Sequence, residues 1–193
     1  MNFLRNLFGK KQPDIQANPA VGTYREDKMS TNQQSQNNIL PPITKEYVSK
    51  NFSGTLQKPT GPGSSEILEA QKYWNSKNYD EAYKFYCAAI QQGIQKGWLA
   101  SAHNSLGQIE IMRGNIYDAV NHFIKCLAIP EHDPVHVWAS AIRLYSIYDE
   151  ADRLQEANEL KELANAANKR GFAILPTVDN ELRTLVHKYI KSR

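Results

Sequence analysis

A five-residue pattern occurs twice in this chain, at residues 78–82 (NYDEA) and 115–119 (NIYDA), so that Ala82 and Ala119 stand 37 residues apart. An aromatic residue follows each alanine by four positions, at Tyr86 and Phe123. Self-similarity at a period of this length indicates stacked supersecondary units, since one unit alone cannot bury its apolar face. The repeat therefore constrains the fold more than any other feature of the sequence.

The repeats fall in a region with helical periodicity. Apolar residues of segment 79–94 recur three or four positions apart, as on one face of an α-helix, and segment 116–128 has the same spacing. No alternating, strand-like pattern competes with this interpretation. Breaks are expected at Gly97, at Gly114-Asn115 and at Gly171, and Asp133-Pro134 is typical of a helix start. The pattern predicts an all-α fold.

The second copy resembles the tetratricopeptide repeat (TPR), a pair of packed helices. The matching residues are Leu106, Gly107, Gly114, Ala119, Phe123, Leu127 and Pro130. A degenerate third copy begins at Trp138, with Ala157 as its small residue and Lys161 where the family has an aromatic. The resemblance covers about residues 66–170 and implies a TPR-like α-solenoid of about three helical hairpins. In such a stack, small side chains let the two helices of a hairpin approach closely.

Three parts of the chain are expected. Residues 1–11 form a short basic amphipathic segment, 12–63 a disordered polar linker rich in Gln, Asn, Ser, Pro and Gly, and 64–193 the repeat domain. Within the linker, segment 43–52 has near-helical spacing and is a candidate for a short helix that docks in cis in the concave groove of the array. A final helix over 177–191, with one apolar face, is expected to cap the array.

The resemblance implies that the first helix of each hairpin lines a concave groove. The groove positions expected to bind a partner are Gln71, Trp74, Asn75, Asn104, Gln108, Met112 and Arg143. Their amide groups suit the backbone of a bound peptide. Some members of the family grip a terminal carboxylate with lysines, but the corresponding positions here hold Ile67, Ser101 and Ala139. We therefore expect no carboxylate clamp.

Catalytic motifs are missing from the sequence: it has no HExxH, GxSxG, Walker loop or GxGxxG. His132, Asp133 and His136 lie close together, but Asp133 is better explained as a helix cap, so we expect neither a metal nor a cofactor. His103, His122 and His187 fall on expected helices without evident partners, and we expect them to be structural or solvated.

Composition agrees with a non-catalytic adaptor or scaffold protein. The net charge of +3 is spread along the chain rather than gathered in a basic patch, so no nucleic-acid partner is expected. The two cysteines make no CxxC motif and are expected to be reduced. No secretory signal and no apolar run of membrane-spanning length is evident, and we expect a cytoplasmic protein.

A second hypothesis concerns the N-terminal segment 1–11. Phe3, Leu4, Leu7 and Phe8 can share one face of a short helix, beside basic residues. Such an element can touch an anionic membrane or fill a partner's groove. The alternative function is therefore a peripheral membrane-associated assembly factor anchored through this segment.

Overall fold

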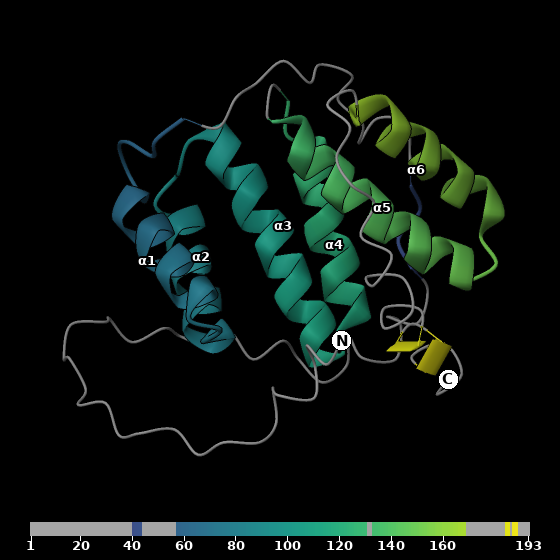
Figure 1. Cartoon of the computed structure of the whole chain (residues 1–193), viewed down its shortest axis with the longest axis horizontal. Helices are drawn as coiled ribbons and strands as arrows, with labels where there is room; N and C mark the ends of the chain where they lie inside the picture. Colours follow the sequence, from purple (N-terminus) through teal and green to yellow (C-terminus); the bar gives the residue numbers. More distant parts are fainter. Residues whose placement is uncertain (1–39, 44–56, 131–132, 169–183, 186, 189–193) are drawn as a thin grey trace. The chain divides into compact units, whose positions relative to one another are not determined.

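Helices are the only regular elements in the residues that the computed structural model describes, namely 40–43, 57–130, 133–168, 184–185 and 187–188 (Figure 1). The six helices that can be bounded are α1 (Ser64–Asn75), α2 (Tyr79–Gln91), α3 (Lys96–Arg113), α4 (Ile116–Ala128), α5 (Pro134–Glu150) and α6 (Leu154–Ala167). The all-α prediction is confirmed for this part of the chain.

Consecutive helices pack in pairs. The largest contacts join α5 to α6, α3 to α4 and α1 to α2, and smaller ones join α4 to α5, α2 to α3 and α3 to α5 (Figure 1). Three helical hairpins thus follow one another along the chain, and α3 and α5, the first helices of two successive hairpins, touch directly. Superhelical progression of the hairpins stays a prediction.

Most helix boundaries follow the residues that signal them. Gly114 ends α3 in the left-handed conformation, with φ at 79°, and α4 begins after Asn115. The side chain of Asp133 accepts a hydrogen bond from the Val135 amide at 3.0 Å, which caps α5. The break expected at Gly97 is wrong: Gly97 lies inside α3, and the chain instead turns at Gly93, which has a φ of 82°.

The small residues of the repeat lie where the helices approach one another. Ala82 and Ala119 are fully buried and Ala157 is 1% exposed. Gly107 is buried on α3, and a Cβ added there would stand 2.6 Å from Cε1 of Phe123 on α4. The hairpin α3–α4 can therefore close only around a residue without a side chain at position 107.

Buried apolar side chains form two main clusters. One gathers residues of α1, α2 and α3, including Ile67, Tyr86 and Leu106. The other gathers residues of α4, α5 and α6, with Phe123 and Tyr148 as its largest side chains. The middle hairpin thus divides its apolar surface, since α3 faces mainly the first cluster and α4 the second.

Residues 57–63 pack on the helices, although the sequence predicts disordered linker there. The indole nitrogen of Trp98 donates to the Gln57 carbonyl at 2.8 Å, and the Gly63 amide donates to Oε1 of Gln92 at 3.2 Å. Gly63 also comes so close to α2 that a Cβ would stand 2.6 Å from the Ala89 carbonyl oxygen. The ordered domain therefore begins before residue 64, because these backbone groups find partners at the C-terminal end of α2 and on α3.

Several expectations fall partly or wholly on residues outside those described. Segment 1–11 lies there entirely, and so does most of the linker and of the docking candidate 43–52. Of the expected capping helix, residues 184–185 and 187–188 are described and helical, and Leu185 packs against the second cluster. Among the described residues, no helix is long and apolar enough to cross a membrane.

Candidate functional site

The groove residues on α3 make a polar contact with α5. Nδ2 of Asn104 donates to Oγ of Ser140 at 2.8 Å, and Oδ1 of Asn104 accepts from Nε2 of Gln108 at 2.7 Å. Asn104 is only 5% exposed, so it does not present its amide to a partner as expected. Its amide instead satisfies the buried hydroxyl of Ser140 and holds the side chain of Gln108, which is itself half-buried.

Of the expected site residues on α1, two are accessible to a partner and one packs inside the hairpin. Gln71 is half-buried and Asn75 is exposed, as binding positions require. The Trp74 ring packs edge-on against Tyr79, with centroids 5.3 Å apart, and against Tyr86, at 6.5 Å. Trp74 therefore contributes mainly to the packing of α1 on α2. Because α1 packs chiefly on α2, the structure does not place these residues against the α3–α5 contact.

Arg143 is a cation in a largely buried position on α5. Its Nη1 donates to the Ala139 carbonyl at 2.7 Å, and its guanidinium carbon lies 5.9 Å from the centre of the Phe123 ring. Burial lowers the pKa of the guanidinium to about 10, which leaves it charged at neutral pH. In the part of the chain that the structure describes, no carboxylate pairs with it. Donors of Arg143 therefore remain for a carbonyl or carboxylate of a ligand.

Met112, the last groove residue of α3, is half-buried and packs against the first apolar cluster. Gln108 and Arg143 therefore remain as the polar binding groups around the α3–α5 contact, with Met112 one helical turn beyond Gln108. This surface offers an amide, a cation and an adaptable apolar side chain. Such a set can hold a peptide backbone and an acidic or apolar side chain, but it contains no nucleophile paired with a base.

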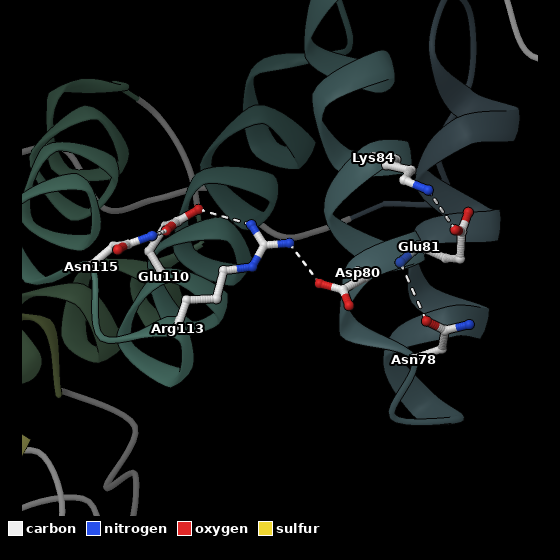
Figure 2. A network of polar contacts seen from close by, with 7 residues as sticks. All are labelled: Asn78, Asp80, Glu81, Lys84, Glu110, Arg113 and Asn115. Carbon is white, nitrogen blue, oxygen red and sulfur yellow. Dashed lines mark hydrogen bonds and ion pairs between the residues drawn. The ribbon is translucent and has the colours of Figure 1, made fainter. Parts of the chain in front are cut away.

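A network that the sequence did not reveal joins the first two hairpins (Figure 2). Arg113 donates from Nη1 to Glu110 at 3.1 Å and from Nη2 to Asp80 on α2 at 2.8 Å. Glu110 is 3% exposed and also accepts from Nδ2 of Asn115 at 2.6 Å. Asp80 and Asn115 belong to the repeated pentapeptides, but the repeat does not indicate their partners Arg113 and Glu110, which only the three-dimensional structure shows.

Replacing Arg113 by Met is expected to lower the free energy of unfolding by about 1–3 kcal/mol, because the buried carboxylate of Glu110 loses its cation. Urea unfolding followed by circular dichroism measures this change. Lys84→Met is the matched control, since Lys84 pairs with Glu81 on the exposed surface, where an ion pair contributes less than about 1 kcal/mol. Equal losses in the two variants would contradict a special role for the Arg113 network.

His103 and His122 form a pair that no pattern in the sequence indicates. Nδ1 of His103 lies 3.1 Å from Nδ1 of His122, so one nitrogen must donate while the other accepts. Burial lowers the pKa of each imidazole to about 4, with a further contribution from the neighbouring Lys125. Both rings are therefore neutral at pH 7. His187, also expected to lack a partner, lies 3.1 Å from Glu150.

The other potential metal ligands and nucleophiles do not form a metal site or a catalytic site among the described residues. His132 of the EHDPVH segment lies outside them, and no group of three or more potential metal ligands comes together within them. Both cysteines are free thiols, as expected. Burial raises the pKa of the Cys126 thiol to about 12 and raises that of Cys87 as well, so neither thiol is poised as a nucleophile.

No protein-family model matches the chain, and no curated protein and no solved structure matches it. The features of the chain that bear on its function are the geometry around α3 and α5, the charge of Arg143 and the repeat pattern.

Proposed function

We propose that the chain is a non-catalytic protein–protein interaction module, an adaptor or scaffold of the cytoplasm, built as a TPR-like array. Its binding surface is the face formed by α3 and α5, with Gln71 and Asn75 of α1 as candidates for an extension. The observation that carries the proposal is the cation of Arg143 beside the α3–α5 contact, which pairs with no carboxylate of the described residues.

A charge in such a position is costly to bury unless something pairs with it. Arg143 uses one donor on a backbone carbonyl of its own helix, and no other described residue accepts a hydrogen bond from its guanidinium. The Asn104–Ser140 bond fixes the spacing of α3 and α5, so Gln108 and Arg143 are held on a rigid base. We therefore assign the ligand as a peptide segment that supplies backbone carbonyls and an acidic side chain.

Replacing Gln108 by Glu and Arg143 by Gln is expected to weaken partner capture at least tenfold, because the surface then repels an acidic segment and loses its best donor. The measurement compares proteins retained by immobilised wild-type and variant chains, quantified by mass spectrometry. Gln91→Glu with Lys96→Gln is the matched control, since it makes the same change in net charge at two exposed positions.

The proposal predicts a set of proteins retained by wild type and control but lost with the Gln108/Arg143 variant. Circular dichroism must show that both variants keep their helix content. Identical retention by all three chains would show that the α3–α5 face does not bind partners. Equal losses in both variants would show that net charge alone explains the effect.

A further inference from the structure

A short segment far from the helices in sequence lies against the end of the array. Residues 40–43, with the sequence Leu-Pro-Pro-Ile, are more than a hundred positions from the α5–α6 turn that they contact. Leu40 is 7% exposed and belongs to the apolar cluster of α4, α5 and α6, against which Ile43 also packs. The sequence predicts linker at 40–42 and places Ile43 at the start of the candidate docking segment 43–52.

Three side chains around this turn bind the segment through its backbone. The Tyr148 hydroxyl donates to the Pro41 carbonyl, and Nη1 of Arg153 donates to the Leu40 carbonyl at 2.6 Å. The Ile43 amide donates to Oε1 of Glu156 at 3.3 Å. Two carbonyls and one amide within four residues are thus satisfied by the array.

The three binding side chains also hold one another in place. Nε of Arg153 donates to Oε2 of Glu156 at 2.6 Å, and a second hydrogen bond joins the same two groups. The Arg153 guanidinium carbon lies 4.8 Å from the centre of the Tyr148 ring. Asp152, with φ at 58°, makes the turn that brings Arg153 back over α5. Such mutual support lowers the entropy that binding would otherwise cost.

The chemistry of the bound segment is that of an extended, proline-containing peptide. Pro41 and Pro42 have no amide proton, and proline restricts both its own φ and the residue before it, which favours an extended chain with free carbonyls. Specificity comes from the buried Leu40 side chain and the partly buried Ile43, whereas Pro42 is exposed. Hydrogen bonds to backbone atoms do not depend on which chain supplies the peptide.

We propose that Tyr148, Arg153 and Glu156 form a second binding site, distinct from the α3–α5 face, for extended peptides of the type apolar–Pro–Pro–apolar. Residues 40–43 of the chain occupy this site in cis. A partner with the same chemistry binds there by displacing them. Because a tethered segment acts at an effective concentration in the millimolar range, the site stays closed to weak ligands until the partner is abundant or multivalent.

The test opens the site in the full-length chain with Leu40→Asp, which places a charge where the structure buries an apolar side chain. The probe is a fluorescent peptide with the sequence of residues 37–45, NNILPPITK. It is expected to bind the Leu40→Asp chain at least tenfold more tightly than wild type by fluorescence anisotropy. The same peptide with Asp in place of its leucine is the matched control and should not bind.

A second variant separates recognition from folding. Tyr148→Phe in the Leu40→Asp chain keeps the buried ring and removes only the hydroxyl that meets the Pro41 carbonyl, so it should weaken the peptide about fivefold, as loss of one hydrogen bond predicts. No binding to a Leu40→Asp chain with full helix content would overturn the proposal. A wild-type dimer that Leu40→Asp converts to a monomer would also overturn it, because the occupant would then be a second copy's segment.

Discussion

Gly107→Ala is expected to lower the free energy of unfolding by about 2 kcal/mol, because overpacking costs up to about 3 kcal/mol and the helix preference of alanine over glycine offsets about 1 kcal/mol of it. The added Cβ would stand 2.6 Å from Cε1 and 2.8 Å from Cδ1 and Cζ of Phe123, well inside contact distance. Phe123 is fully buried in the second apolar cluster, so its ring cannot move aside without disturbing α4 and α5. Urea unfolding followed by circular dichroism measures the loss.

Phe123→Leu supplies the control for this clash. The smaller side chain vacates the space that the new Cβ needs, so Gly107→Ala should cost at least about 1 kcal/mol less in the Phe123→Leu background than in wild type. Additive losses in the double variant would mean that Gly107 is required for another reason than contact with the ring. A stabilising effect of Gly107→Ala in wild type would contradict the close packing of α3 on α4.

Acidification from pH 7 to pH 5 is expected to destabilise the chain through His103 and His122. The pKa of each imidazole is lowered from 6.5 to about 4 in the folded chain. Between these two pKa values the unfolded state binds protons that the folded state does not bind. The free energy of unfolding therefore falls as the pH drops from about 6.5 towards 4. The loss between pH 7 and pH 5 is about 2 kcal/mol for each histidine, and somewhat less for a coupled pair.

Unfolding of wild type and of a His103→Gln, His122→Gln variant at several pH values checks this expectation. The variant will differ in absolute stability, but its carboxylates titrate as in wild type, so only the difference in pH dependence reports on the imidazoles. The variant should lose about 2–4 kcal/mol less than wild type between pH 7 and pH 5. If stability depended on pH equally in wild type and variant, protonation of the histidine pair would not destabilise the folded chain.

The sequence predicted the helices well where a local signal was strong. The Gly114-Asn115 and Asp133-Pro134 breaks lie where expected, and segment 116–128 coincides with α4. Gly97 misled because a glycine can sit in the first turn of a helix, and the chain turned instead at Gly93. Helix start and stop signals of this kind depend on residues within a few positions, so they can be recognised in the sequence alone.

The candidate sites were predicted less well than the helices. The resemblance to the tetratricopeptide repeat selected Gln108 and Arg143 as groove positions. It also selected Asn104, which is buried against Ser140, and Trp74, which packs inside its own hairpin. Spacing along one helix says which residues share a face. It does not say how closely the next helix covers that face.

By itself, the sequence determined the all-α class and most helix limits, because these depend on neighbours three or four positions away. The repeat and its resemblance to a known family also indicated the small residues Ala82, Gly107, Ala119 and Ala157. Only the tertiary structure decided which polar groups meet: Arg113 with Asp80, His103 with His122, and the Leu-Pro-Pro-Ile segment with Tyr148 and Arg153. Those partners are between 19 and 113 residues apart in the chain. The packing of apolar helix faces brings these partners together, and no local sequence pattern indicates which of them will be in contact.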